Sequence, residues 1–130
     1  MTVTLKAAVV GSRGWTDARL VNATLDALHT AEGIDLVVSG GAAGADTFGA
    51  LWAEHHGVPL DIIRPTWRVN GVYNSRAGFE RNVDIVKKAD IVVAFWDGSS
   101  RGTADDIRLA RQQGKRCIVV SPDGSTVEEA

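Results

Sequence analysis

Five short apolar runs, spaced almost evenly along the chain, constrain the fold more than any other feature of the sequence. They cover residues 5–10, 34–38, 60–63, 91–95 and 117–120, and each is rich in valine, isoleucine or leucine. None alternates apolar with polar residues, as a strand with one solvated face would. The runs therefore predict strands that are covered on both faces, as in a parallel sheet.

Segments with helical periodicity lie between these runs. Asp17 is a good N-cap for a first helix, which places Val21, Leu25 and Leu28 on one face. Further helices are predicted over residues 45–56, 77–88 and 103–113. The alternation predicts an α/β fold, a Rossmann-like three-layer α/β/α sandwich around a five-stranded parallel sheet of order 3-2-1-4-5. In such a sheet a ligand binds beyond the carboxyl ends of the central strands.

The length of 130 residues fits one domain. We expect that domain to cover residues 1–120, and we expect the polar, acidic tail 121–130 to fray. The longest segment without predicted structure is 65–76, and long loops in compact domains are often functional.

Composition narrows the class of protein. The net charge of −2 gives no sign of a general nucleic-acid binder, although it leaves a local basic patch open. A single cysteine, Cys117, excludes a disulfide within the chain, and with only three histidines a zinc site is not expected. No apolar stretch is long enough for a membrane span, so we expect a cytoplasmic protein. The sequence gives no basis for assigning a metal.

Three of the predicted strands end in unusual loops, at residues 11–15, 39–46 and 96–103. Parallel strands all point the same way, so the three loops should meet at one edge of the sheet. Glycines allow sharp turns and close approach of a ligand, and the N–H groups at the helix starts favour an anion. Arg13 and Arg101 could hold phosphate through forked hydrogen bonds. The candidate ligand-binding residues of these loops are Gly11, Ser12, Arg13, Trp15, Ser39, Gly40, Gly41, Gly44, Asp46, Trp96, Ser99, Ser100, Gly102 and Thr103.

Each of these features also has a purely structural explanation. Tight turns need glycine without any ligand, and Asp46 is favourable at a helix N-terminus whatever else it does. Tryptophans usually pack, although Trp67 is a candidate for base stacking because it lies in the long loop. Arg81 and Asn82 would reach a phosphate if the start of their helix faces the crevice. Neither the dinucleotide fingerprint nor a P-loop lysine is present, so the motifs do not indicate NAD or ATP chemistry.

The order of these motifs resembles the SLOG superfamily, which includes the LOG phosphoribohydrolases and the Smf/DprA proteins, and within it the small YspA-like proteins. The resemblance covers residues 6–120. It is carried by Gly11-Ser12-Arg13, the run Ser39-Gly40-Gly41-Ala42, the pair Arg81-Asn82, the run Ala94-Phe95-Trp96 and the pair Gly102-Thr103. It implies a nucleotide or nucleotide-derived ligand, and it implies that the chain forms a homo-oligomer, a dimer or higher.

The LOG enzymes add a more specific expectation. Their motif P-G-G-x-G-T-x-x-E is matched at Gly102-Thr103, and Asp106 stands where the motif has glutamate. Arg81 resembles the arginine of the preceding helix, so Asp106 and Arg81 are the candidate catalytic residues if the protein is an enzyme. Gly98, Ser99 and Ser100 replace P-G-G, and aspartate is a shorter acid than glutamate.

Three functions follow from these features. The first is a binding protein for a phosphorylated, nucleotide-like small molecule, acting as a sensor, carrier or sequestering protein. The second is a LOG-like N-glycosidase, and the third is DprA-like binding of single-stranded DNA. The incomplete catalytic motif favours binding over hydrolysis, and the acidic balance of the chain disfavours DNA.

Overall fold

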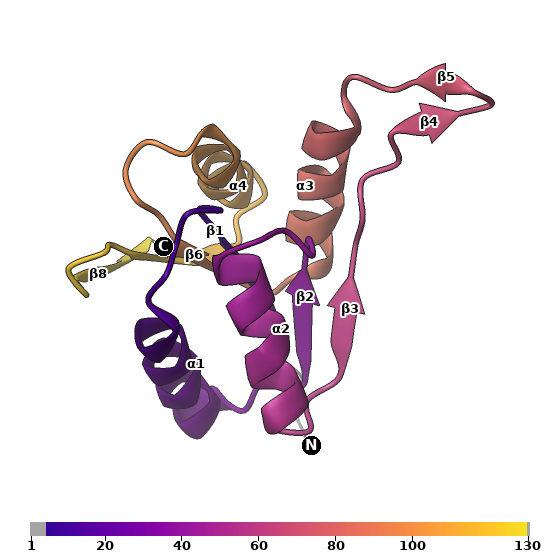
Figure 1. Cartoon of the computed structure of the whole chain (residues 1–130). Helices are drawn as coiled ribbons and strands as arrows, with labels where there is room; N and C mark the ends of the chain where they lie inside the picture. The colour runs from indigo at the N-terminus through magenta and orange to yellow at the C-terminus, as the bar shows by residue number, and fades with distance from the viewer. Residues whose placement is uncertain (1–4, 130) are drawn as a thin grey trace.

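The computed structural model describes residues 5–129, and a six-stranded sheet organises them (Figure 1). Five strands are parallel: β1 (Lys6–Gly11), β2 (Leu36–Ser39), β3 (Leu60–Ile62), β6 (Ile91–Phe95) and β7 (Arg116–Val120). The sheet order is β3-β2-β1-β6-β7-β8, so the predicted order of the five parallel strands is confirmed. The expectation of only five strands is wrong, because β8 (Thr126–Glu129) joins the edge in the antiparallel sense.

Four helices cover the two faces of the sheet. They are α1 (Ala18–Glu32), α2 (Ala45–His55), α3 (Ala77–Lys88) and α4 (Arg101–Gln112). Helices α1 and α2 share one apolar core with the sheet residues Val9, Val37 and Val93. Helices α3 and α4 share the other core with Ala8, Val10 and their neighbours, because successive strand residues point to opposite faces. The predicted three-layer sandwich is therefore confirmed (Figure 1).

Helix α1 begins where the sequence predicts. The Asp17 carboxylate accepts a hydrogen bond from the Leu20 N–H at 3.0 Å, which satisfies one donor at the open start of the helix. Val21, Leu25 and Leu28 are buried, as their spacing predicts. Gly33 follows with a φ of 77° and donates its N–H to the His29 carbonyl at 2.9 Å.

The tail does not fray as expected. Strand β8 pairs with β7 through Val119↔Val127 and Val120↔Thr126. The two strands are joined by a turn in which Asp123 Oδ1 accepts a hydrogen bond from the Ser125 N–H at 2.9 Å. Strand pairing explains the order, because β7 would otherwise present unpaired backbone groups at the sheet edge.

Residues 65–76 are also more regular than expected. They contain a two-stranded hairpin, β4 (Arg68–Val69) and β5 (Val72–Tyr73), which stands out from the body of the molecule (Figure 1). Its turn has positive φ at Asn70 and Gly71, 52° and 80°, which is the geometry that an Asn-Gly pair favours in tight hairpins. Among the residues that the structure describes, no helix is long and apolar enough to span a membrane.

Candidate functional site

A cleft of about 480 Å³ opens at the carboxyl ends of β1 and β6, between the loops that follow β1, β2 and β6. Its position is the one that the strand order predicts. The residues that line it are Val10, Gly11, Ser12, Arg13, Gly14, Ala42, Asp46, Arg81, Asn82, Ile85, Asp97, Ser100, Gly102, Thr103 and Asp106. The cleft thus brings together side chains from segments that lie far apart in the sequence.

Asp46, at the start of α2, is a buried carboxylate with partners. Its side chain is only 6% exposed, and the backbone N–H groups of Ala42, Gly40 and Gly11 hydrogen-bond to it. Burial raises the pKa of Asp46 to about 6, although those amides and the charge on Arg81 oppose the rise. The carboxylate therefore holds the loops after β1 and β2 together, much as a bound anion would.

Asp106, in the second turn of α4, is a buried carboxyl group without such support. Its side chain is 5% exposed, it lines the cleft, and its Oδ1 atom has no hydrogen-bond partner. Burial raises the pKa of Asp106 well above its usual range, and the charges on Asp46 and Asp105 raise it further. Asp106 therefore keeps its proton to a higher pH than an ordinary aspartate, and its buried, unpartnered Oδ1 calls for a partner.

Arg81 connects the third helix to the loop after β2. Its Nη1 donates to the Gly40 carbonyl oxygen at 3.0 Å, and its Nε donates to Asn82 Oδ1 at 3.1 Å. Its positive charge lowers the pKa of both Asp46 and Asp106. The start of α3 does face the crevice, which was the condition for Arg81 and Asn82 to take part in the site.

The N-terminus of α4 forms one wall of the cleft. No side chain caps it, and the first N–H groups of an α-helix have no acceptor within the helix. The hydroxyl groups of Ser100 and Thr103 lie beside it, 3.2 Å from one another. This wall can receive an anion through backbone N–H groups and two hydroxyl groups.

Asp97 is a cleft residue that the sequence analysis missed. Its Oδ1 accepts hydrogen bonds from the N–H groups of Ser99 and Ser100, at 2.9 and 2.8 Å, and those bonds lower its pKa. Its own N–H donates to the Ser12 hydroxyl at 3.2 Å, which joins the loops after β6 and β1. The sequence signal that could have found it is an aspartate two residues before a serine in a turn. In such turns the aspartate side chain often accepts a hydrogen bond from the backbone N–H two residues further on.

The glycines of the loops have different roles. A β-carbon on Gly11 would lie 2.5 Å from that of Ala45, and one on Gly44 would lie 2.4 Å from the Ser12 carbonyl oxygen. These two glycines allow the loops to pack against one another, which is the structural explanation of their presence. Gly102 differs, because nothing lies within 4 Å of a β-carbon placed there. Its surface is open to a ligand.

The tryptophan candidates do not line the cleft. Trp15 is 6% exposed and packs on Phe95 with 5.5 Å between ring centroids. Trp96 is half-buried, packs against the α3/α4 core and donates its Nε1 hydrogen to the Ser100 carbonyl at 3.0 Å. Trp67 lies at the base of the hairpin, 46% exposed.

Five smaller candidates also lie outside the lining: Ser39, Gly40, Gly41, Gly44 and Ser99. Ser39 is buried behind the cleft, where its hydroxyl donates to the Asp46 carbonyl at 3.2 Å and accepts from the Gly41 N–H. Gly40 supports Arg81 and Asp46 through its backbone. The other nine candidates of the loops and of α3, together with Asp106, are brought together in the cleft.

A smaller pocket of about 330 Å³ adjoins this cleft and shares Gly14 and Asp97 with it. Trp15, Thr16, Asp17 and Pro122 complete its lining. Within residues 5–129, no cluster of three histidine, cysteine or acidic side chains is arranged to hold a metal ion.

Solved structures share this fold. DNA processing protein A (DprA) from Streptococcus pneumoniae matches with a TM-score of 0.75 and 19% identity over 90% of this chain. DprA from Helicobacter pylori, whose structure concerns its binding of single-stranded DNA, matches with a TM-score of 0.69 and 22% identity over 89% of this chain. TM1055 matches with a TM-score of 0.67 and 23% identity over 87% of this chain. The chain spans 50%, 65% and 72% of these three chains, respectively.

Sequence comparison identifies the family. The gene 61 protein of Mycobacterium phage D29 is 36% identical over 113 residues, which cover 82% of this chain and 88% of the phage protein. The family model for the YspA, cpYpsA-related SLOG family, YAcAr, matches residues 5–69. That match includes the loops after β1 and β2, and the resemblance seen in the sequence is confirmed. The chain belongs to the YspA, cpYpsA-related SLOG family.

Proposed function

We propose that the protein binds a nucleotide or a nucleotide-derived phosphorylated small molecule in the cleft, as a sensor, carrier or sequestering protein. The observation that carries the proposal is the unpartnered, buried Oδ1 of Asp106 beside the uncapped start of α4. A bound ligand would supply a hydrogen-bond partner for Asp106 Oδ1 and an acceptor for the free N–H groups at the start of α4. The volume of about 480 Å³ suits a ligand of nucleotide size.

The phosphate belongs at the start of α4 rather than at the other loops. Asp97 already occupies the amides of Ser99 and Ser100, and Asp46 occupies those of the loops after β1 and β2. The first amides of α4 and the hydroxyls of Ser100 and Thr103 have no such carboxylate. Arg13, exposed at the cleft, and Arg81 supply positive charge.

A thermal-shift screen tests this proposal. The panel would hold nucleoside mono-, di- and triphosphates, cyclic nucleotides, NAD and ADP-ribose. A ligand at about 100 times its Kd adds about 2.7 kcal/mol to the free energy of unfolding, which is easily measured. We expect Thr103→Ala and Gly102→Asp to abolish the shift. Ser99→Ala is the matched control, because Ser99 lies in the same loop but outside the cleft.

A second candidate is an N-glycosidase, and the pair of buried carboxyl groups favours it. Burial raises the pKa of Asp46 to about 6 and that of Asp106 well above its usual range, and the two environments differ because backbone amides favour the ionised form of Asp46. In this reaction the bond between C1′ and the base nitrogen breaks, and its electron pair leaves with the base. Asp106 donates its proton to the base, the Asp46 carboxylate stabilises the positive ribose, and water adds at C1′ and gives up a proton.

Mass spectrometry of the ligand separates the two candidates. Free base that appears with wild type and not with Asp106→Asn supports the glycosidase. A ligand that binds and remains intact supports the binding protein. DNA binding within the cleft is disfavoured, because the carboxylate of Asp97 lines the cleft and the chain carries a net charge of −2, both unfavourable for a long polyanion.

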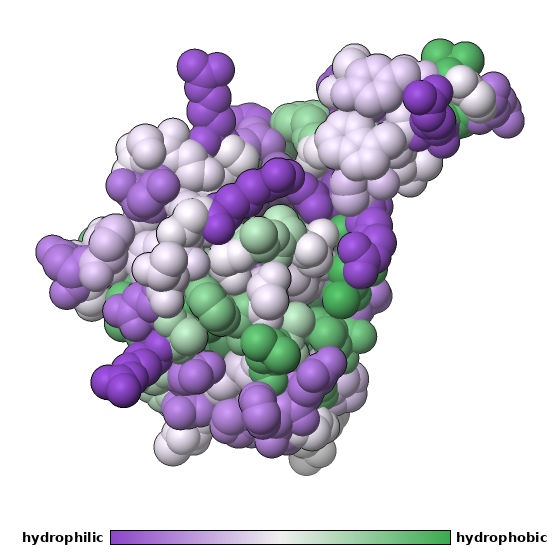
Figure 2. Space-filling view, viewed as in Figure 1, coloured by the Kyte–Doolittle hydropathy of each residue, from purple (hydrophilic) through white to green (hydrophobic). Residues whose placement is uncertain are grey.

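We also propose that the chain forms a homo-oligomer in the cytoplasm. Hydrophobic side chains gather over α2 and β3 (Figure 2), where Leu51 is 45% and Ile62 is 37% exposed. Strand β3 is also an edge of the sheet. Light scattering at micromolar concentration tests the oligomer, and a monomer mass would contradict it.

A further inference from the structure

The hairpin arm, which we define as residues 64–76, combines positive charge with exposed aromatic surface. It carries Arg64, Arg68 and Arg76 and no acidic residue, in a chain whose net charge is −2. Trp67 is 46% and Tyr73 is 61% exposed. Within the described part of the chain, none of the three arginines forms an ion pair with a carboxylate.

A comparison with the other acid-free basic stretch shows why the arm stands out. Residues 107–122 also hold several basic side chains and no acid. There, Arg108 pairs with Asp105, and Arg116 pairs with both Glu32 and Glu128. The charges of Arg108 and Arg116 are neutralised by carboxylates of the protein itself, whereas the arginines of the arm have no such carboxylate and can contact a partner.

The two rings of the arm form an open stack. The Trp67 and Tyr73 rings are nearly parallel, 4° apart in orientation, with 6.1 Å between their centroids. Trp67 lies against the start of α3, because its Cη2 is 3.8 Å from the position that a β-carbon on Gly78 would take. Tyr73 is the more exposed ring, so a further flat ring can extend the stack on its outer side.

The arginines lie around this stack. Arg68 is directly opposite Tyr73 in the β4–β5 pairing, and opposed residues project from the same face of a hairpin. Arg76 is held over the Phe79 ring at 5.5 Å from its centroid. Arg64 lies at the junction with the body, beside Gly41. Positive charge therefore follows the arm from its base to the ring that is free to stack.

The arm is held at its base while its tip is free. Asn74 donates its N–H to the Trp67 carbonyl at 2.6 Å, and its side chain donates to the Thr66 carbonyl at 3.2 Å and to Glu80 at 3.3 Å. Figures 1 and 2 show the arm standing clear of the helices and the sheet. Such an arm presents its surface with little loss of conformational freedom on binding.

We propose that the hairpin arm binds single-stranded nucleic acid, with a base stacked on Tyr73 and adjacent phosphates on Arg68, Arg76 and Arg64. Bases offer flat rings and the backbone offers closely spaced anions, which is the combination that the arm complements. A lipid surface fits less well, because the apolar tip consists of only Val69 and Val72 and is interrupted by Asn70-Gly71. The proposal goes beyond the cleft ligand, since no residue of the arm lines the cleft.

Fluorescence anisotropy with a labelled twelve-nucleotide single strand, at about 50 mM salt, tests the proposal. We expect Tyr73→Ala to weaken binding roughly tenfold, as loss of one stacking ring does elsewhere, and Tyr73→Phe to retain it. Arg68→Gln should weaken binding and reduce the salt slope by about one. Arg19→Gln is the matched control, because Arg19 is an exposed arginine on α1, away from the arm.

The same experiment separates this proposal from the cleft ligand. Gly102→Asp, a cleft variant, should bind the strand as wild type does, and loss of strand binding in that variant alone would overturn the proposal. Equal affinity of wild type and Tyr73→Ala would also overturn it. So would binding to phosphatidylserine vesicles without binding to the strand. Thermal melts of each variant verify that a lost signal is not lost folding.

Discussion

Asp46 and Asp106 lie in one cleft, and their carboxyl groups are held in different ways. Asp46 is surrounded by backbone amides that favour its ionised form. Asp106 has an unpartnered Oδ1, and burial together with the charge on Asp46 raises its pKa well above the usual range. Motif reasoning identified both residues, but it could not distinguish them, because the difference comes from tertiary burial and from loops that fold back on Asp46.

The free energy of unfolding should fall with rising pH because of these two acids. A raised folded-state pKa means that the folded protein retains a proton that the unfolded chain releases above its ordinary pKa of 3.8. For Asp46 the fall spans pH 4 to about 6 and amounts to about 3 kcal/mol, from a rise of about two pKa units. The raised pKa of Asp106 adds a further fall of the same sign.

Asp106→Asn should remove the part of this fall that Asp106 contributes. We expect the stability of the variant to fall less with rising pH than that of wild type, because asparagine has no proton to release. Urea unfolding at pH 5, 6, 7 and 8 measures the two curves. Parallel curves would show that Asp106 ionises normally in the folded protein.

Gly44→Ala and Gly102→Ala should have opposite effects. Gly44 has a φ of 77°, and its added β-carbon would overlap the Ser12 and Arg13 carbonyl oxygens, so we expect a loss of about 2 kcal/mol or more. Gly102 meets nothing, and alanine in the first turn of α4 should leave stability unchanged or raise it by up to about 1 kcal/mol. Thermal melts with and without ligand check both. Ligand stabilisation should weaken in Gly102→Ala, and an unchanged ligand shift would place the ligand away from that wall.

At the scale of elements, the sequence predicted the helices and the parallel strands and missed three short strands. The strands and helices of the sandwich follow from apolar periodicity, and β6 and α3 lie where it predicts. Strands β4, β5 and β8 have little or no buried face, so periodicity carried no signal for them. The residue types favoured in turns do predict these strands. Asn70-Gly71 predicts a hairpin, and Pro122-Asp123-Gly124 predicts the turn before β8.

Asn74→Ala should loosen the hairpin arm without unfolding the protein. The substitution removes the side-chain bonds to Thr66 and Glu80 and the acceptor of the Arg76 N–H. We expect trypsin to cut after Arg68 several times faster, with global stability changed by no more than about 0.5 kcal/mol. Asn70→Gly, which suits the positive φ of the turn, is the control and should not speed cleavage. Equal cleavage rates for Asn74→Ala and wild type would mean that the arm is held by other contacts.

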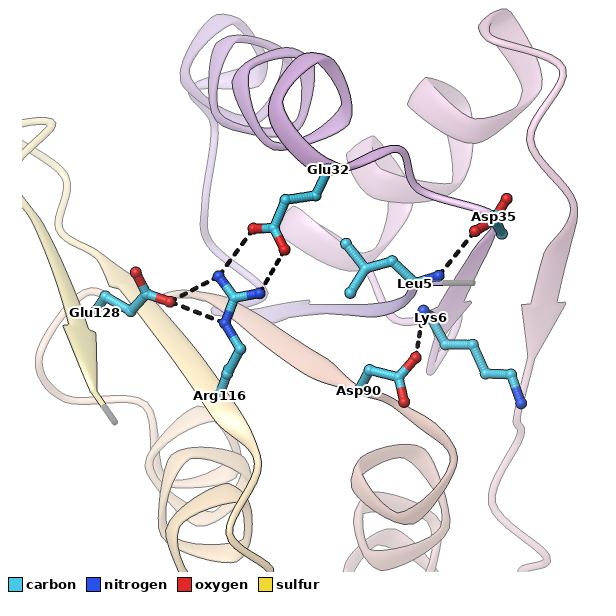
Figure 3. A network of polar contacts seen from close by, with 7 residues as sticks. All are labelled: Leu5, Lys6, Glu32, Asp35, Asp90, Arg116 and Glu128. Carbon is cyan, nitrogen blue, oxygen red and sulfur yellow. Dashed lines mark hydrogen bonds and ion pairs between the residues drawn. The ribbon is translucent and has the colours of Figure 1, made fainter. Parts of the chain in front are cut away.

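At the scale of the whole molecule, one arginine joins the end of α1 to the C-terminal strand β8. Arg116 on β7 makes two hydrogen bonds to Glu32, at the end of α1, at 2.6 and 2.9 Å, and two to Glu128 on β8, at 2.9 and 3.1 Å (Figure 3). The two carboxylates raise the pKa of Arg116, and Arg116 lowers that of Glu32. Sequence reasoning could not find this network, because the three residues are brought together only when β8 pairs with the sheet.

Arg116→Gln should therefore release β8 before it affects the core. The ion pairs are exposed, so their effect on global stability should be small and should shrink in 1 M salt, where the Debye length is about 3 Å. Strand β8 depends on them more, because it is an edge strand whose backbone pairs with β7 and whose Val127 is 60% exposed. Hydrogen exchange should show faster exchange for the β8 amides and unchanged exchange for β1 and β6. Lys88→Gln, which removes the exposed pair with Asp61, is the matched control and should leave β8 unchanged. If β8 exchanges at the wild-type rate in Arg116→Gln, backbone pairing alone holds the strand, and the turn at Pro122-Asp123-Gly124 rather than the ion network fixes this edge of the sheet.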